Sequence, residues 1–441
     1  MRDPAAGLAG AMGDFLSSAP VSDEQRDQAR LAILDTVGVA LAGGGERTPA
    51  ALRQMLRPGW DTDPTLWWDR SPTALTGTVL ANAAAAHALD YDCLIPAAYV
   101  QPGAVLIPGL VALAEQEGLA GARLLDGVAR GIDLLGALGR TLGHQLHTAG
   151  WHPTSVLGAL AGAAAGASLM GQPQAGVTTA VNIAASLSSG LKQNFGSTTK
   201  ELQVGEAARG AVEAAALSGA GITADARAAD SWLDLITASG PGAPVVELET
   251  CARGVHVKRY PCCGRMHAAL DAGAALRRRQ APEPDEVRAV DCHLNPADIA
   301  HIDRDEVRTP AQAKFSVQYG LARMLVRGHA GLSDFELPEL AAADVASVMT
   351  RVRIRPDDSV PSFGAEVVLE LSAGRRDGQR ADAPLPATAD DVADKFTDCC
   401  AAGGREAAQA REFAAMLGKI DDLPDVRTLF RSLPGLVAVA G

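Results

Sequence analysis

One short acidic segment, AHALDYDC, places an imidazole and two carboxylates close together: His87, Asp90 and Asp92. Carboxylates beside a histidine can orient it as a base, and the same groups can hold a metal ion. Carboxylates near a helix end also act as caps for the next element. The segment alone therefore predicts either proton-transfer groups or capping groups at Asp90 and Asp92.

A second candidate is His152, which lies directly before Pro153 at the expected start of a helix. A helix N-terminus is electropositive and offers free N–H groups, which suits a bound anion. A neutral histidine beside it could move protons near pH 7, or it could be a buried structural histidine. His144 and His147 have the spacing of a metal pair, but no further ligand follows suitably, so we expect no metal.

A hydroxyl-rich segment, NFGSTTKELQVGEAARG, precedes a helix that we expect to begin near Val204 or Gly205. Ser197, Thr199 and Lys200 would supply hydroxyls and an ammonium beside free N–H groups, which makes a cradle for a carboxylate or phosphate. The GxxxxGK[ST] order of a nucleotide-binding P-loop is absent. The alternative is ordinary N-capping with a surface lysine.

Basic side chains gather around a Tyr–Pro turn in the segment HVKRYPCCGRMHAALDA. They are Lys258, Arg259, Arg265 and His267. Because the chain is acidic overall, a site for an anion must concentrate its cations locally, and this segment does so. It fits either a ligand site at a domain junction or a solvated hinge. Farther on, AKFSVQYG carries Tyr319 near the start of another expected helix.

The composition favours a large folded protein with closely packed helices. Of 441 residues, 47% are hydrophobic and 4% are aromatic, and the net charge is −13. An Ala-rich, aromatic-poor core suits helices, and the negative charge disfavours nucleic-acid binding. The chain has seven cysteines and no CxxC pair. We expect reduced thiols in a cytoplasmic protein, with no disulfide framework and no iron–sulfur cluster.

Neither a leader peptide nor a membrane helix is expected. Met1–Ala19 lacks a basic region followed by an apolar run. Residues 141–191 contain no Asp, Glu, Lys or Arg, but His, Pro and Gln side chains interrupt the segment and Gly recurs through it. This pattern indicates a buried helical centre and not a membrane span.

Helical patterns fill the chain up to about residue 245. The first strong helix opens with a capping box formed by Ser22 and Gln25. Gly158, Gly162 and Gly166 recur every four residues, which predicts close contact between core helices.

The pattern changes after Lys258, where strands are expected at Val287–Asn295, Val348–Ile354 and Ala365–Leu371. Gly374 and Gly378 would form a hairpin turn after the last of these strands. Helices return after residue 386. We therefore expect a mainly α fold, in which a large all-helical domain (1–257 and 386–441) carries an inserted α+β lid domain (258–385).

Several blocks together resemble the MmgE/PrpD family, which includes 2-methylcitrate dehydratase, cis-aconitate decarboxylase and iminodisuccinate epimerase. In chain order the blocks are LAILDTVGVALAGG, AHALDYDC, QPGAVLIPGLVALAE, GWHPTSVLGALAGAAAG, FGSTTKELQVGEAARG, VKRYPCCGRMHAALDA and AKFSVQYGLA. The resemblance implies the same helical domain and lid, a homodimer, no metal or organic cofactor, and a substrate cleft between domain and lid. The family residues of that cleft correspond here to Asp90, His152, Lys200, Lys258 and Tyr319.

The chain departs from the family pattern in several of these blocks. Where the family has Asp-Asp-Thr-His, Asp92 is followed here by Cys93, Leu94 and Ile95. A family His-Pro is Gln101–Pro102, and a family Lys-Pro-Leu-His is the segment 200–203, which ends in Gln. These departures leave a different substrate, a rearranged proton donor and a loss of activity as alternatives.

The expected function is that of a cofactor-independent lyase, most simply a dehydratase or hydratase of a di- or tricarboxylic acid with an enediolate-like intermediate. His152 would act as acid or base with Asp90 orienting it or sharing protons, Lys200 and Lys258 would bind carboxylate and stabilise charge, and Tyr319 would be a second proton donor. Alternatively, a lysine crowded by other cations would have a lowered pKa and act as the base. Substrate binding is expected from a further set of side chains: Arg259, Ser197, Thr199, Gln101, Asp92 and His267. The alternatives are decarboxylation or epimerisation of a related acid, and a catalytically silent ligand-binding subunit. We expect a small carboxylic acid as partner, no nucleic acid, no membrane, and a cytoplasmic homodimer.

Overall fold

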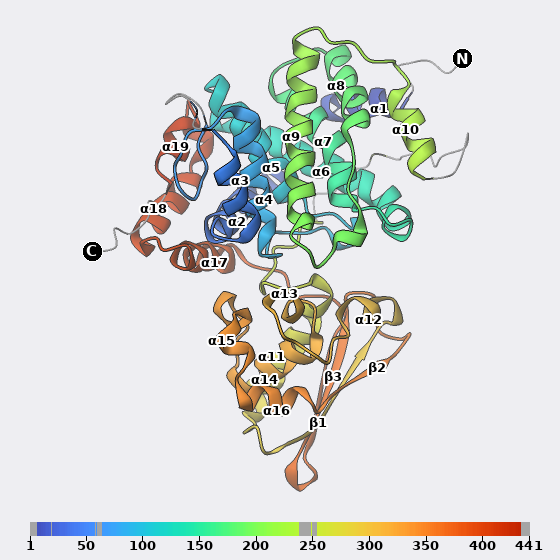
Figure 1. The fold of residues 1–441 in the computed structure, drawn as a ribbon, viewed down its shortest axis with the longest axis vertical. Coiled ribbons are helices and arrows are strands. Elements are labelled where there is room, and N and C mark those ends of the chain that lie inside the picture. The colour runs from blue at the N-terminus through green and yellow to red at the C-terminus, as the bar shows by residue number, and fades with distance from the viewer. Residues whose placement is uncertain are drawn as a thin grey trace. The chain divides into compact units, whose positions relative to one another are not determined.

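The computed structural model describes residues 7–18, 20–57, 59, 64–237, 248 and 254–433. The chain divides into two compact units, and each is described by itself (Figure 1). Unit 1 combines Met1–Val257 with Thr388–Gly441, and unit 2 is the intervening segment Lys258–Ala387. Unit 1 is helical and unit 2 combines helices with a four-stranded sheet, so the expected mainly α fold with an inserted α+β region is confirmed. Cys251, expected to be a reduced thiol, lies outside the described residues.

Unit 1 is a bundle of helices with α7 at its centre, packed against α5, α6, α8 and α9. Its α-helices are α1 (Leu8–Ser17), α2 (Asp23–Gly43), α3 (Arg47–Met55), α4 (Leu75–Ala88), α5 (Pro102–Glu117), α6 (Gly121–Thr148), α7 (Pro153–Leu169), α8 (Gln174–Leu187), α9 (Thr199–Gly219), α10 (Ala228–Ile236), α17 (Ala389–Ala402), α18 (Ala407–Leu417) and α19 (Arg427–Arg431). The uncharged segment 141–191 contains the last turns of α6 followed by α7 and α8. Within the described residues, no helix combines the length and apolar character of a membrane span.

The glycine repeat on α7 allows neighbouring helices to approach its backbone. A methyl group added at Gly162 would lie 2.8 Å from the Cβ of Ala211 on α9. At Gly166 the nearest atom would be a methyl of Leu113 on α5, at 3.1 Å. The predicted close contact between core helices is therefore confirmed.

An early and a late segment of the chain pack together in unit 1. The predicted capping box of Ser22 and Gln25 is present at the start of α2. A second capping box, Thr388 with Asp391, starts α17 as the chain returns from unit 2. α17 packs against α2, which Figure 1 shows as red and blue helices side by side.

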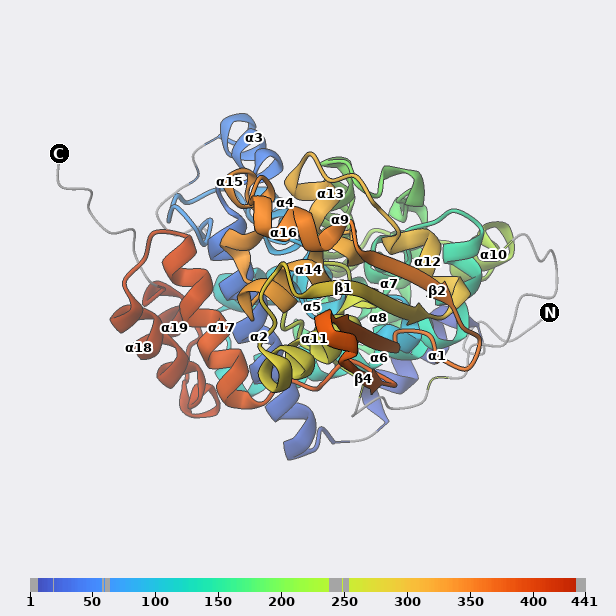
Figure 2. The same ribbon diagram turned by 90° about the horizontal axis from the view of Figure 1, so that it is seen from below.

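Unit 2 is a mixed sheet with helices packed on it. Its strand order is β2-β1-β3-β4, with β1 and β2 parallel and the remaining pairs antiparallel. The strands are β1 (Val287–Leu294), β2 (Val352–Pro356), β3 (Ala365–Leu371) and β4 (Arg376–Ala381). The α-helices are α11 (His267–Gln280), α12 (Pro296–Ile302), α13 (Pro310–Ala313), α14 (Val317–Arg327), α15 (Leu337–Leu340) and α16 (Ala343–Met349). α11 packs on β3 and β4, as Figure 2 shows from a second side.

Two details of the strand prediction are wrong. The segment expected to start a strand at Val348 instead ends helix α16, and β2 begins at Val352. Gly374 lies in the turn after β3 with a φ of 73°, but Gly378 pairs with Val368 inside β4. Strand β4 has a polar sequence, RDGQRA, with alternating half-buried and exposed positions. Such an edge strand carries no hydrophobic alternation that would predict it.

Candidate active site in the helical unit

The segment after α4 carries two carboxylates into a buried setting. α4 ends at Ala88, and Asp90 then adopts a left-handed backbone with a φ of 51°. Asp tolerates this conformation better than most residues, and such conformations concentrate at functional sites. After this reversal Asp90 is 8% exposed and Asp92 is fully buried.

Asp92 holds the imidazole of His87, which comes from the last turn of α4. His87 Nδ1 lies 3.0 Å from Asp92 Oδ2, and both side chains are completely buried. The other ring nitrogen, Nε2, is buried and has no hydrogen-bond partner among the residues that the structure describes. A buried polar atom without a partner is uncommon and marks a place where a ligand could bind.

Asp90 forms a buried ion pair with Lys200. Lys200 Nζ donates to Asp90 Oδ1 at 2.7 Å, and the two side chains are 11% and 12% exposed. The predicted helix start near Val204 or Gly205 is wrong, because α9 begins at Thr199 and carries Lys200 in its first turn. The ammonium is therefore positioned by a helix and not by a loop, which favours a defined geometry.

His152 precedes the first residue of α7 and is 2% exposed. Its Nδ1 lies 2.7 Å from the amide nitrogen of Gln203, and its ring meets Phe195 edge to face, with centroids 4.8 Å apart. Its ring also stacks on His87 at 5.8 Å. Burial, followed by the nearby His87 and Lys200, holds the pKa of His152 well below its usual value, so the imidazole is neutral at pH 7.

Gln101 joins the two carboxylates. It precedes the first residue of α5, and its amide nitrogen donates to Asp92 Oδ1 at 2.9 Å and approaches Asp90 Oδ1 at 3.5 Å. Its backbone N–H donates to the hydroxyl of Thr154 on α7 at 3.1 Å. The residue that stands in place of the family histidine therefore orients both acids.

Helix α17, in the C-terminal part of unit 1, supports the acidic segment that carries Asp90 and Asp92. Lys395 on α17 pairs with Asp35 on α2 at 2.5 Å and donates to the carbonyl oxygen of Tyr91 at 2.6 Å. The other oxygen of Asp35 accepts from the backbone N–H of Cys93 at 2.9 Å. Both chain ends thus hold the backbone on either side of Asp92.

The starts of three long helices meet at this cluster. Gln101 precedes α5, His152 precedes α7, and Lys200 lies in the first turn of α9. The hydrogen bonds and ring contacts above connect all three. Helix N-termini carry partial positive charge, so their convergence favours an anionic ligand with more than one negative group.

The two hydroxyl residues predicted to bind substrate are more exposed. The Ser197 hydroxyl donates to the carbonyl oxygen of Asn194 at 2.8 Å and accepts from the Thr199 N–H at 3.4 Å. Both residues lie at the exposed start of α9. These contacts shape the turn before α9, and substrate binding by either hydroxyl stays a prediction.

The remaining predicted site residues belong to unit 2. Lys258, its first residue, is 2% exposed. Arg259 lies 3.6 Å from Asp271 on α11, and His267, 1% exposed, meets Tyr260 edge to face at 5.2 Å.

Tyr319 lies in the core of unit 2, at the start of α14. Its hydroxyl donates to the carbonyl oxygen of Asp334, and burial raises its pKa to about 12. The catalytic roles assigned to Lys258 and Tyr319, and the binding roles of Arg259 and His267, stay predictions.

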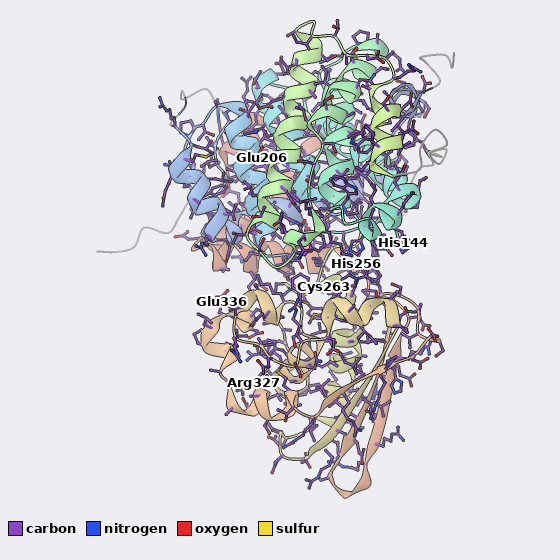
Figure 3. The ribbon with its side chains drawn as sticks, turned by 45° about the vertical axis from the view of Figure 1, so that its right-hand side comes forward. His144, Glu206, His256, Cys263, Arg327 and Glu336 are labelled. Carbon is purple, nitrogen blue, oxygen red and sulfur yellow. The ribbon has the colours of Figure 1, made fainter. Side chains whose placement is uncertain are left out.

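No group of His, Cys, Asp and Glu side chains suited to a metal ion occurs among the described residues. His144, on α6, instead places Nδ1 3.1 Å from the hydroxyl of Tyr99 (Figure 3).

Neither His87 nor Gln203 is among the residues predicted to be catalytic or to bind substrate, although both touch the cluster. The sequence could have indicated His87 by its position beside two acids. It could have indicated Gln203 because this residue replaces a histidine of the family pattern.

The chain belongs to the MmgE/PrpD family. Models of the MmgE/PrpD N-terminal domain and C-terminal domain match residues 12–236 and 260–419 respectively. The resemblance deduced from the sequence blocks is therefore confirmed.

Relatives with assigned activities are similar over most of the chain. A human protein named cis-aconitate decarboxylase is 26% identical over 385 residues, which are 81% of this chain and 78% of that protein. The mouse protein of the same name is 25% identical over 91% of this chain and 88% of its own length. The cis-aconitate decarboxylase of Aspergillus terreus is 26% identical over 73% of this chain and 71% of its own length.

Proposed function

We propose that this protein is a cofactor-independent lyase that acts on a di- or tricarboxylic acid. The observation that carries the proposal is the buried Asp90–Lys200 pair beside the neutral imidazole of His152, at the meeting point of three helix N-termini. A substrate with several carboxylates matches the positive potential of such a site. The names of the relatives, all cis-aconitate decarboxylases, support the lyase class.

In this proposal, bond cleavage leaves negative charge on the carbon beside a carboxylate, and that charge spreads over its oxygens as an enediolate. The Lys200 ammonium stabilises this charge, and it does so strongly because its side chain is only 11% exposed. Asp90 keeps the ammonium in place, and Gln101 keeps Asp90 and Asp92 in place. The Lys258 and Arg259 cations and the Tyr319 hydroxyl are proposed to add to binding and proton supply.

Two reactions within the lyase class are candidates. Dehydration or hydration is the simplest reaction through an enediolate, and the sequence favours it. Decarboxylation is supported by the names of the relatives, so cis-aconitate is the first acid to test. A homodimer is also proposed, which light scattering on the purified chain would test.

The experiment incubates the purified protein with cis-aconitate, citrate and 2-methylcitrate in deuterated water, followed by mass spectrometry and CO₂ detection. Decarboxylation releases CO₂, dehydration or hydration changes the mass by one water, and epimerisation exchanges hydrogen for deuterium with no change in composition. The Lys200→Met variant should lose turnover while keeping the helical circular-dichroism spectrum. A folded wild type that converts none of a broad panel of polycarboxylates would overturn the proposal in favour of a silent binding protein.

A further inference from the structure

The backbone of Leu191 allows only one orientation of the Gln203 side-chain amide. The backbone N–H of Leu191 lies 3.0 Å from Gln203 Oε1, and the Leu191 carbonyl oxygen lies 3.3 Å from Gln203 Nε2. Rotating the amide by 180° would place NH₂ against an N–H and oxygen against oxygen. Leu191 therefore fixes which end of the amide faces His152.

That end is the NH₂ group, 2.7 Å from His152 Nδ1. An amide nitrogen only donates hydrogen bonds, so Nδ1 must accept one and cannot carry a proton. The proton of the neutral His152 ring is therefore on Nε2. An imidazolium would set an Nδ1–H against the NH₂ group, and the positive charge of Lys200 disfavours it further.

His87 is held in the opposite way. A carboxylate oxygen of Asp92 lies 3.0 Å from His87 Nδ1, and Gln101 donates to the other oxygen at 2.9 Å. Since an ionised carboxylate only accepts, His87 Nδ1 carries a proton, and in the neutral ring the buried Nε2 presents a lone pair. Nδ1 of His152 thus accepts a hydrogen bond, whereas Nδ1 of His87 donates one.

We propose that Gln203 and Asp92 lock the stacked imidazoles in opposite tautomers, so that His152 offers Nε2–H as a neutral hydrogen-bond donor and His87 offers Nε2 as an acceptor. This role rests on the proposed function. His152 then stabilises an enediolate oxygen by donating a hydrogen bond from Nε2, and it does not remove a proton through Nδ1. Gln203 and Asp92 act as positioning residues. This changes the roles that the sequence assigned, acid or base for His152 and substrate binding for Asp92.

The direct test is long-range ¹H–¹⁵N correlation NMR on the protein labelled at histidine nitrogen, at pH 7.5. His152 should show a protonated Nε2 and an unprotonated Nδ1, and His87 the reverse. Loss of each signal set in His152→Asn and His87→Asn assigns the rings. A His152 signal with protonated Nδ1, or the same tautomer at both rings, overturns the proposal.

The Gln203→Glu variant tests the positioning role, because a carboxylate accepts where the amide donates. It should move the proton of His152 to Nδ1 or give an imidazolium, with kcat lowered by about 10²-fold and KM changed much less. Gln172→Glu is the matched control. Gln172 also donates to a backbone carbonyl, that of Ala215 at 2.7 Å, but it follows the far end of α7. That variant should leave the His152 tautomer unchanged.

The outcomes separate the two proposals. The NMR signals report the tautomers with no substrate present, so they remain informative if no acid is turned over. Turnover with a His152 ring protonated at Nδ1 would support the lyase and refute the tautomer assignment. An unaltered His152 spectrum in Gln203→Glu would refute the role of Gln203.

Discussion

The two units both bury charged side chains, but they complete the hydrogen bonding of those charges differently. In unit 2, Asp298 pairs with Arg265 and accepts from the Ser362 hydroxyl at 3.0 Å and the Phe363 N–H at 2.7 Å. Asp334 likewise pairs with Arg323 and accepts from His329 and from the Gly331 N–H, each at 2.7 Å. Both carboxylates are thus surrounded by donors of their own unit.

The cluster in unit 1 differs at one ring. In the Asp92–His87 pair, the imidazole Nε2 is buried and has no hydrogen-bond partner among the described residues. A buried carboxylate whose oxygens are engaged by donors stabilises a fold and specifies its packing, whereas a buried imidazole nitrogen without a partner is available to a ligand. The comparison assigns a structural role to the ion pairs of unit 2 and a chemical role to the cluster of unit 1. Other charged side chains, such as Glu206, Arg327 and Glu336, which Figure 3 labels, belong to neither group.

The largest expected effect is on stability in unit 2. Arg323→Met removes a nearly buried cation and leaves Asp334 with an uncompensated charge. We expect the free energy of unfolding of unit 2 to fall by about 3–5 kcal/mol, measured by urea denaturation. Arg308→Met is the control, because its pair with Glu306 is largely exposed and should contribute less than about 1 kcal/mol. Equal losses in the two variants would contradict the comparison.

For Lys200→Met in unit 1 we expect a loss of turnover and not a loss of folding. Turnover of the acid found by the substrate screen should fall by about 10²–10³-fold, because charge stabilisation at the enediolate is lost. Lys419→Met, at an exposed position of the same unit, should keep full turnover. Steady-state kinetics on both proteins, with circular dichroism to check folding, measures this. A Lys200→Met protein that is fully active would remove the chemical role of the cluster.

Packing of the bundle should show an intermediate effect. Gly162→Ala forces a methyl group to within 2.8 Å of Ala211, and we expect a loss of about 1–3 kcal/mol from the misfit between α7 and α9. Gly210→Ala on α9 meets its nearest neighbouring atom at 3.5 Å, so the same change should be neutral or slightly stabilising there. Thermal denaturation of the two variants compares them directly. If both lose the same stability, the close approach of α7 and α9 is not what the glycine provides.

The smallest expected effect is a pH dependence that arises in unit 1. The pKa of His152 is lowered by folding, so the folded protein binds fewer protons than the unfolded chain below the usual histidine pKa. Stability from this group is present above about pH 6.5 and falls as the pH drops toward the folded pKa, by up to about 1.4 kcal/mol per pH unit. Urea denaturation from pH 7.5 to 5.5 should show this slope in the wild type and a smaller slope in His152→Asn. Parallel curves for the wild type and His152→Asn would refute the assignment.

Local patterns predicted much of the fold because they depend on neighbouring residues. The capping box at Ser22 and the glycine spacing on α7 are features of this kind. The start of α9 was misplaced because hydroxyl residues resemble a cap, while the helix in fact begins among them at Thr199. Strand β2 begins later than predicted because Val348 and Met349 are apolar, which suits a buried helix as well as a buried strand. In the structure they end helix α16, which packs against α14.

By itself, the sequence determined the family, the mainly α class, and the presence of acids, lysines and histidines able to handle a carboxylic acid. Tertiary structure alone decided which of them touch, because Asp90 reaches Lys200, and His152 reaches Gln203, only after the starts of separate helices have packed together. It also decided what each group can do. Whether an imidazole donates or accepts depends on the hydrogen-bonding partner of its other nitrogen, and no spacing along the chain specifies that partner.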